Sequence, residues 1–437
     1  MTDQYDIIVV GAGVAGGVFA ASQASNRKIL LIERTLSEQE RIVGELMQPD
    51  GLIALEKLGL SHLTKNIDAK AVAGYKLIKG DEAFQIQYSE IDQNLEGLGL
   101  RNGKFLLNIQ DELRKKPNIT LIEGNVTQLI EKGEKVVGVE YMNHDGNKKS
   151  VHAPLTVASD GHMSLFRKKL SEPNKKIQSY FMGLVLKNLE LPHSSLGHMI
   201  LSGDSPILVY PITSTDYRIL VDYPGEKPPR MGSKSMLKFK EDVSKLLPKE
   251  MIPAFHRALE EQQVKVMPNH SMKAQAFKKE GAVLLGDSLN MRHPLTGGGM
   301  TAAFNDIIQL NKSLKDIEFT DGAKLKNAIQ YYYVNRQQSV ETINILANAL
   351  YKVFTDNDLK DATFQYLKKG GKKSTGPLSI LAGVNKNKKF LLKHFFKVAL
   401  QQPINFIIKP KKQIRLFKKA VNVIKPVLKD EEKPAMI

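Results

Sequence analysis

Two short apolar runs flank a glycine-rich turn at the start of the chain. Residues 5–10 are apolar enough for a buried strand, and residues 18–25 are small and compatible with a helix. A second apolar run covers residues 28–32 and ends at Glu33 and Arg34. This order predicts a βαβ unit, in which a helix connects two neighbouring strands.

A second strand, turn and helix are predicted between residues 282 and 307. Ala282 to Leu285 form an apolar, partly β-branched run that is typical of a buried strand. Pro294 excludes a continuous helix, and Gly297 to Gly299 leave one turn of backbone without side chains. A helical apolar face then begins, with Met300, Ala303, Phe304 and Ile307.

The remaining chain alternates between strand-like and helical patterns. A third apolar strand, residues 156–158, is followed by Ser159, Asp160 and Gly161. Short strands and turns alternate over residues 62–150, and further strands are expected at 181–186, 207–210 and 217–222. Residues 321–368 are predicted to be helical, with an apolar face that suits core packing.

Composition narrows the chemistry that the chain can perform. The 437 residues contain no cysteine, which excludes disulfides, thiolate catalysis and Cys-ligated metals. His193, His198 and His270 show no metal-ligand spacing, so we expect surface or structural roles for them and no metal site. No apolar stretch is long enough for a transmembrane helix, and we expect no signal or transit peptide at the start.

Most of the net charge of +17 lies in the C-terminal region. Every charged residue between Val384 and Lys429 is basic, and bulky apolar residues such as Phe395, Phe396, Phe406 and Ile407 are interleaved with them. A solvated helix face or a nucleic-acid contact would also be basic. The bulky apolar content favours monotopic attachment to an anionic membrane surface, and we expect no nucleic-acid partner.

The glycines of the first turn have the spacing of a dinucleotide-binding fingerprint. Gly11 would form the tight turn, Gly13 would let a pyrophosphate approach the backbone, and Gly16 would let helix and strand pack closely. Glu33 lies near the expected separation for an acid that accepts a hydrogen bond from a ribose hydroxyl. With a strand on each side of it, the motif predicts a bound dinucleotide.

The second glycine turn suggests which dinucleotide is bound. A flavin extends far beyond its ADP half, so a distant segment must hold its ribityl chain and ring. Asp287 can bond ribityl hydroxyls, and the helix that starts at Gly297 to Gly299 offers backbone N–H groups and partial positive charge. An ordinary Gly-rich turn would show the same local pattern. Together with the first turn and Asp160, the segment resembles the three fingerprints of single-component FAD monooxygenases.

Two longer motifs narrow the resemblance to one family. The sequence RIVGELMQPDG at residues 41–51 and the sequence NMRHPLTGGGMT at residues 290–301 resemble the squalene monooxygenase (squalene epoxidase) family of membrane-bound FAD enzymes. The similarity covers nearly the whole chain. It implies an α/β fold of the GR2/PHBH type, in which a Rossmann-like FAD-binding domain carries an inserted β-rich substrate domain and C-terminal membrane-associated helices.

The expected domains follow from this fold. Residues 1–176 would bind FAD, and residues 177–275 would form the β-rich substrate domain. Residues 276–370 would complete the FAD-binding domain and add a helical region. Residues 371–437 would form basic amphipathic helices that anchor the protein to the membrane.

The resemblance also implies a set of site residues. Relatives have an arginine at the position of Lys104; lysine keeps the charge but loses the planar fork, and Arg101 is the alternative. Tyr75 matches a family tyrosine near flavin and substrate and is the expected catalytic residue, although an aromatic in a half-buried strand would look the same. The expected FAD-binding residues are Gly11, Gly13, Val14, Ala15, Gly16, Glu33, Arg34, Arg41, Leu46, Arg101, Lys104, Val126, Asp160, Asp287, Gly298, Gly299 and Met300.

The reaction implied by the resemblance is epoxidation of squalene to (S)-2,3-epoxysqualene with O2, through a flavin C4a-hydroperoxide. Electrons would come from NADPH through NADPH–cytochrome P450 reductase. The expected location is the endoplasmic reticulum membrane, with lipid droplets as a second location. Two alternatives keep the nucleotide-binding fold: a flavin enzyme acting on another isoprenoid lipid, and a non-enzymatic prenyl-binding chaperone of the Rab GDP-dissociation-inhibitor type.

Overall fold

The computed structural model describes residues 5–23, 25–225, 228–230, 232–261, 264–400 and 410–431. Its first sheet has seven strands, of which β8, β2, β1, β11 and β17 are parallel and β9 and β10 are antiparallel additions at one edge. In spatial order the strands are β10 (Lys148–His152), β9 (Lys135–Asn143), β8 (Ile119–Lys132), β2 (Ile29–Glu33), β1 (Ile7–Val10), β11 (Leu155–Ala158) and β17 (Ala282–Leu284).

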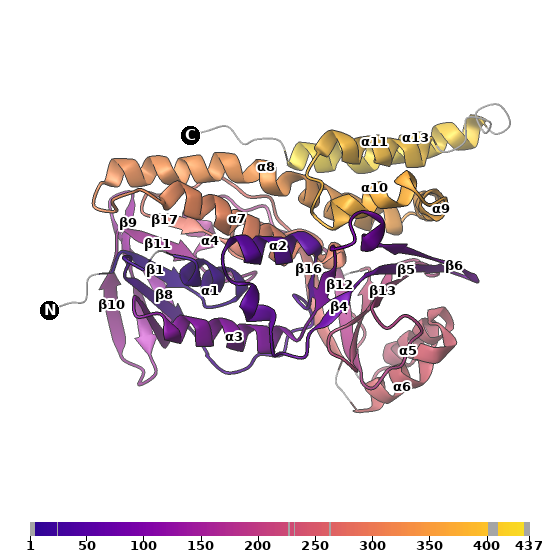
Figure 1. The fold of residues 1–437 in the computed structure, drawn as a ribbon, viewed down its shortest axis with the longest axis horizontal. Coiled ribbons are helices and arrows are strands. Elements are labelled where there is room, and N and C mark those ends of the chain that lie inside the picture. Colours follow the sequence, from indigo (N-terminus) through magenta and orange to yellow (C-terminus); the bar gives the residue numbers. More distant parts are fainter. Residues whose placement is uncertain are drawn as a thin grey trace.

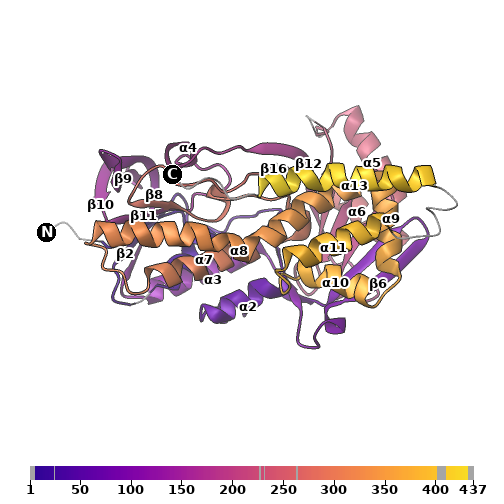
Figure 2. The same cartoon turned by 90° about the horizontal axis from the view of Figure 1, so that it is seen from above.

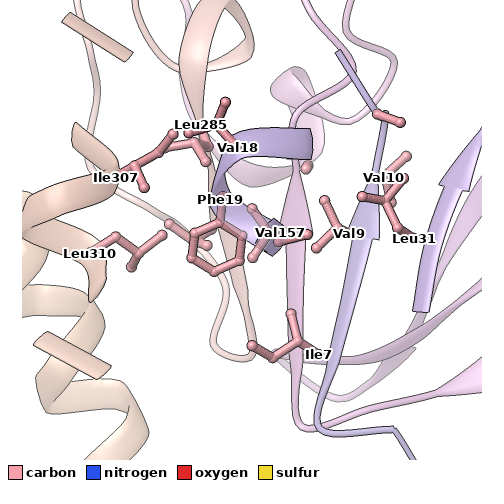
Figure 3. Close-up of a cluster of buried hydrophobic side chains, with 14 of the residues drawn as sticks. Ile7, Val9, Val10, Val18, Phe19, Leu31, Val157, Leu285, Ile307 and Leu310 are labelled. Atoms are coloured by element: carbon pink, nitrogen blue, oxygen red, sulfur yellow. The ribbon is translucent and has the colours of Figure 1, made fainter. Parts of the chain in front are cut away.

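The core of this sheet explains why its strands read as continuous apolar runs. Helices α1 (Val14–Ala21), α3 (Asn102–Lys115) and α7 (Gly299–Leu314) pack on the sheet. In Figure 3, Ile7 and Val9 of β1 lie beside Phe19 of α1, and Ile307 and Leu310 of α7 lie in the same cluster. Parallel strands covered by helices must be apolar on both faces, and every residue of β1 is buried.

A second seven-stranded sheet takes strands from distant parts of the chain. Its order is β16 (Lys265–Ser271), β12 (Lys176–Leu186), β15 (Tyr217–Tyr223), β14 (Ile207–Pro211), β13 (Leu196–Ile200), β5 (Gly74–Lys79) and β6 (Glu82–Gln87). Helices α5 (Lys234–Leu246) and α6 (Ile252–Glu261) pack on it, so the region is not made of strands alone. The expected strands at 181–186, 207–210 and 217–222 lie within β12, β14 and β15.

The expected boundary at residue 176 does not separate the two sheets. Residues 74–87 belong to the second sheet because β5 pairs in parallel with β13, with Gly74 opposite Leu196. A small third sheet of β3 (Leu46–Met47), β7 (Gly97–Gly99) and β4 (Lys70–Val72) lies before α3 in the chain. The chain therefore crosses from the first sheet to the second and back before β8.

The C-terminal helices pack on the rest of the protein. The long helix α8 (Gly322–Phe354) is followed by α9 (Asn357–Lys368), α10 (Lys372–Leu381), α11 (Lys388–Ala399) and α13 (Pro410–Asp430). Figures 1 and 2 show α13 lying along α11 and α8, with which it is in contact. Ala420, Ile424 and Val427 of α13 are buried there. Phe406 and Ile407, together with Ile404 and Ile408, lie outside the described residues.

The described helices include none that is both long and apolar enough to cross a lipid bilayer.

Candidate active site

The first glycine turn is closed on its protein side and open on the other. A Cβ on Gly16 would lie 2.0 Å from the carbonyl oxygen of Gly11 and 2.3 Å from Ser159 Oγ, so α1 packs directly on the turn. Gly11 has a φ of +97°, which strongly favours glycine. A Cβ on Gly13 would meet no atom within 4 Å. Gly13 therefore leaves the N-terminal end of α1 accessible to a ligand.

Glu33 places a carboxylate beside this turn, at the end of β2. Its Oε2 accepts a hydrogen bond from the backbone N–H of Ala12 at 2.6 Å, and its Oε1 accepts one from the backbone N–H of Arg34 at 2.9 Å. The Arg34 side chain is exposed. Val126 is buried on β8, three residues after Glu123, which pairs with Glu33 across the two strands. Glu33 and Arg34 therefore lie at one end of the first turn, and Val126 lies further along the neighbouring strand β8.

The corner formed by Gly286 and Asp287, after β17, faces the Gly11–Gly16 turn. A Cβ on Gly286 would lie 2.7 Å from Ala15 Cβ, and Gly286 has a φ of +67°. Asp287 is exposed, whereas the residues on either side of it are buried. The structure thus brings Ala15 of α1 and the Gly286–Asp287 corner together at the carboxyl ends of β1, β11 and β17, the usual ligand position in open α/β sheets.

Arg167 braces this corner, and sequence reasoning gave it no role. Its guanidinium donates to the carbonyl oxygens of Ser288 at 2.9 Å, Asp287 at 2.9 Å and Gly161 at 2.9 Å. Burial lowers the pKa of the guanidinium, and the nearby carboxylates of Asp160 and Asp287 offset only part of this effect. The arginine joins the Asp160–Gly161 segment to the Asp287 segment, and its place next to Phe166 in a short basic stretch gave no signal of this contact.

Asp160 carries an unused buried acceptor. Its Oδ2 accepts from the backbone N–H of Leu165 at 2.8 Å, while its Oδ1 is buried and has no partner among the described residues. Buried polar atoms are nearly always hydrogen-bonded, so an orphan acceptor at a ligand-facing corner indicates a ligand donor. Asp160 lies beside the first turn, because a Cβ on Gly11 would lie 3.3 Å from its Cα.

Tyr75 belongs to a buried hydrogen-bond network that reaches Thr296, just before the Gly297–Gly299 turn. Gln48 Nε2 donates to the Tyr75 hydroxyl at 2.8 Å and to the carbonyl oxygen of Thr296 at 2.6 Å. The Tyr88 hydroxyl donates to Gln48 Oε1 at 2.5 Å. Burial raises the pKa of Tyr75 and raises the pKa of Tyr88 well above its ordinary value, so both phenols stay protonated at neutral pH.

Gln48 and Tyr88 are site residues that the sequence did not reveal. Gln48 lies in the 41–51 motif, but its contact with Tyr75 depends on how β5 joins the second sheet. Leu46 lies close to the same turn, because a Cβ on Gly297 would lie 3.3 Å from Leu46 Cγ. Gly298 is buried, Gly299 is exposed at the start of α7, and Met300 is buried.

A buried cluster around His293 joins the second sheet to the segment before the Gly297–Gly299 turn. The Ser179 hydroxyl donates to Asp222 Oδ1 and lies 3.1 Å from His293 Nε2. His293 stacks on Tyr351 with ring centroids 3.9 Å apart. Burial raises the pKa of Asp222 to about 6 and lowers that of His293 to about 3, so the histidine is neutral at neutral pH. The cluster fixes the segment before the glycine turn and was not found from the sequence.

The basic candidates lie on the loop before β3 and at the start of α3. Arg41 is exposed, and its carbonyl oxygen accepts from Arg218. Arg101 pairs with Asp216 at 2.6 Å, and Lys104 pairs with Glu38 at 3.3 Å. The structure gives Arg101 and Lys104 acidic partners of their own, so neither is shown at the glycine corners. His193 is exposed and His198 buried, and no cluster of His, Asp or Glu that could hold a metal ion occurs in the described ranges.

These residues fit a flavin nucleotide. The open approach at Gly13 suits a pyrophosphate, the exposed Asp287 suits a ribityl hydroxyl, and the orphan oxygen of Asp160 suits a further ligand donor. The corners that carry them are in contact through Ala15 and Gly286. The chain has no cysteine. Redox chemistry at this site therefore belongs to the cofactor, and the protein binds and orients it.

Fold and site together define a mixed α/β protein with an FAD-binding, monooxygenase-type Rossmann fold. Among solved structures, p-nitrophenol 4-monooxygenase from Pseudomonas putida superposes with a TM-score of 0.72 at 18% identity, over 89% of this chain and 99% of that one. The family model for glucose inhibited division protein A matches residues 6–283. The model described as squalene epoxidase matches residues 152–420.

Curated relatives give the particular family. Squalene epoxidase 1 of Arabidopsis thaliana is 40% identical over 443 aligned residues, covering 98% of this chain and 83% of that protein. Squalene monooxygenase of Mus musculus is 35% identical, covering 90% of this chain and 71% of that protein. The chain belongs to the squalene epoxidase family.

Proposed function

We propose that the protein is a squalene monooxygenase that uses FAD to convert squalene and O2 to (S)-2,3-epoxysqualene. NADPH supplies two electrons, so one oxygen atom enters the epoxide and the other leaves as water. Membership of the squalene epoxidase family, with similarity over nearly the full chain, is the observation that carries this proposal. The same observation disfavours a non-enzymatic prenyl chaperone.

The protein's own residues perform the binding and positioning. Glu33 and the turn of Gly11, Gly13 and Gly16 hold the adenine half of the dinucleotide, and Asp287 accepts from the ribityl chain. Bound FAD supplies electron transfer and oxygen activation. The start of α7 presents backbone N–H groups and the positive end of the helix dipole to negative charge on the reduced ring.

Tyr75 and Gln48 orient the substrate side of the site. Gln48 uses its amide to tie the Tyr75 hydroxyl to the backbone just before Gly297. The phenol stays neutral, so it can donate a hydrogen bond or pack against an alkene without bringing charge into an apolar pocket. Tyr75 and Gln48 would thus help to position the double bond of the substrate and to exclude water from it.

The partners follow from the chemistry of the substrate. A C30 hydrocarbon is nearly insoluble in water, so the protein must take it from a lipid phase. We propose that the C-terminal helices attach the protein to the endoplasmic reticulum membrane, with lipid droplets as a second location. Electrons would arrive from NADPH through NADPH–cytochrome P450 reductase.

Product analysis tests the proposed reaction. Flavin-loaded protein in membranes is incubated with squalene, NADPH, the reductase and oxygen, and the extracted lipids are examined for the epoxide. We expect (S)-2,3-epoxysqualene in amounts that depend on NADPH and O2. A flavin-loaded preparation that consumes NADPH but forms no epoxide would contradict the assignment of the substrate.

Asp287→Ala is expected to weaken FAD binding about tenfold or more. A hydrogen bond to a charged group contributes about 1.5–3 kcal/mol, and each 1.4 kcal/mol corresponds to roughly tenfold in affinity. Titration of apoprotein with FAD measures the change through flavin fluorescence. Asp316→Ala, which removes another exposed carboxylate just beyond the C-terminal end of α7, is the control. An unchanged dissociation constant in Asp287→Ala would remove the ribityl role.

A further inference from the structure

The turn between α10 and α11 contacts the start of helix α2 (Pro49–Lys57). The backbone N–H of Asp50 donates to the carbonyl oxygen of Ala382 at 2.9 Å. A Cβ on Gly383, which has a φ of +79°, would lie 2.7 Å from Asp50 Cβ and 3.2 Å from Thr301 Cγ2. Only a residue without a side chain allows this approach. A turn of the C-terminal region is therefore built into the joint between α2 and α7.

The same turn supplies the counter-charge of a buried carboxylate. Asp50 is 5% exposed, and its Oδ2 lies 3.0 Å from Lys386 Nζ. Lys386 also donates to Asn305 Oδ1 at 2.8 Å, while Asn305 Nδ2 donates to Asp50 Oδ2 at 2.7 Å. No second salt bridge to Asp50 is found within the part of the chain that the structure describes. Removing one member of such a group leaves a buried charge without its partner.

Lys386 is itself held from a second side. Its carbonyl oxygen accepts a hydrogen bond from Thr342 Oγ1 of α8 at 2.6 Å. The lysine thus connects α8, through its backbone, with α2 and α7, through its ammonium group. Its side chain is about one-third exposed, at 34%, so the ammonium reaches Asp50 from the protein surface.

Asp50 lies two residues after Gln48, whose side chain connects Tyr75 with the glycine turn. Gln48 is the N-cap of α2, and its side-chain amide holds the Tyr75 hydroxyl and the Thr296 carbonyl oxygen. On the other side, Asn305 is on α7, which starts at Gly299. A displacement of Asp50 therefore moves the beginning of α2 relative to the beginning of α7, and both beginnings line the proposed flavin and substrate site.

We propose that Lys386 is a positioning residue of the active site: by neutralising Asp50 it fixes the start of α2, and with it the Gln48 amide, against Tyr75 and the Gly297–Gly299 turn. The inference rests on the proposed function only in identifying that turn as the flavin-facing one. The turn between α10 and α11 would then support the active site, in addition to the proposed role of the C-terminal helices in membrane attachment.

Lys386→Met in the full-length protein tests the role. We expect at least tenfold weaker FAD binding to the apoprotein. In the reductase assay we expect a larger share of the consumed NADPH to appear as hydrogen peroxide instead of epoxide, because the alkene is no longer held in place. Lys386→Arg keeps the charge and should restore most of both properties. Lys389→Met, which removes an exposed lysine of the next helix, should keep the wild-type affinity for FAD.

A charge-balanced variant covers the case in which Lys386→Met does not fold. Asp50→Asn combined with Lys386→Met removes the buried carboxylate together with its cation, so it should be more stable and bind FAD better than the single variant. A double variant no better than Lys386→Met would overturn the proposal, as would a single variant with the FAD affinity of Lys389→Met. FAD affinity does not depend on squalene, so a failed epoxide assay in wild type would count against the substrate alone.

Discussion

Replacing Gly13 with alanine is expected to weaken FAD binding at least 100-fold (about 2.8 kcal/mol) and to leave folding intact. Gly13 has a φ of −66°, which alanine adopts without strain, and a Cβ there would meet no protein atom within 4 Å. The methyl group would project into the space at the N-terminal end of α1 that a pyrophosphate must approach. We expect the dissociation constant to rise at least 100-fold, or about 2.8 kcal/mol at 1.4 kcal/mol for each tenfold.

Two other glycines separate this effect from a general loss of stability. Gly16→Ala would place its Cβ 2.0 Å from the Gly11 carbonyl oxygen. This overlap in the βαβ unit should lower the unfolding temperature of the protein. Gly322→Ala, at the start of α8, has space on the protein side and should leave FAD binding unchanged. Thermal unfolding of the apoproteins and FAD titration give the two readouts. A Gly13→Ala protein with wild-type FAD affinity would show that no pyrophosphate lies at this turn.

The elements that the sequence predicted well are local ones. The order of strand, Gly11–Gly16 turn, helix and acid is written in about thirty consecutive residues, and so is the strand–turn–helix order around Gly286 and Gly299. Both patterns fold as expected, and the FAD-binding, monooxygenase-type α/β fold and the family are confirmed. Close contact between Ala15 and Gly286 follows from the parallel order of β1, β11 and β17.

The contacts that the sequence did not predict depend on long-range pairing. Tyr88 and Gln48 meet Tyr75 because β5 pairs with β13 and β6 pairs with β5 in the second sheet, although the preceding strands β1 and β2 belong to the first. No local periodicity encodes which sheet a short amphipathic strand will join. The role of Arg167 was equally hidden, because its guanidinium donates to four backbone carbonyl oxygens on two segments, 161–162 and 287–288, that are more than 100 residues apart in the chain.

The C-terminal region shows how one pattern can serve two surfaces. Apolar residues at helical spacing among lysines suit a membrane, but the same spacing also suits packing on α8. In α13 the structure divides them: Ile424 and Val427 are buried, whereas Ile414 and Phe417 are 47% and 37% exposed. Truncation after Lys373 would remove the buried and the exposed apolar residues of α13 together with Lys386. It would therefore disrupt the contact between Lys386 and Asp50 of α2 as well as detach the protein from the membrane.

A substitution confined to the exposed set is therefore the sharper test of membrane attachment. Ile414→Glu combined with Phe417→Glu is expected to lower binding to anionic vesicles at least 100-fold. Full burial of such a side chain contributes about 1.5–3 kcal/mol, so the loss of two amounts to about 3–6 kcal/mol and exceeds the roughly 2.8 kcal/mol that 100-fold requires. The two added negative charges are also repelled by the anionic surface.

The controls for this variant separate attachment from folding. Leu237→Glu on α5 changes a 71% exposed apolar residue outside the C-terminal helices and should leave vesicle binding intact. The tail variant should also retain FAD affinity, and its unfolding temperature measures what is lost with the contact between Phe417 and Phe396 of α11, whose ring centroids are 5.8 Å apart. Vesicle flotation that is unchanged in the tail variant, or reduced equally by Leu237→Glu, would show that α13 does not provide the membrane-facing surface, since the exposed apolar positions are where a lipid contact on this helix must be made.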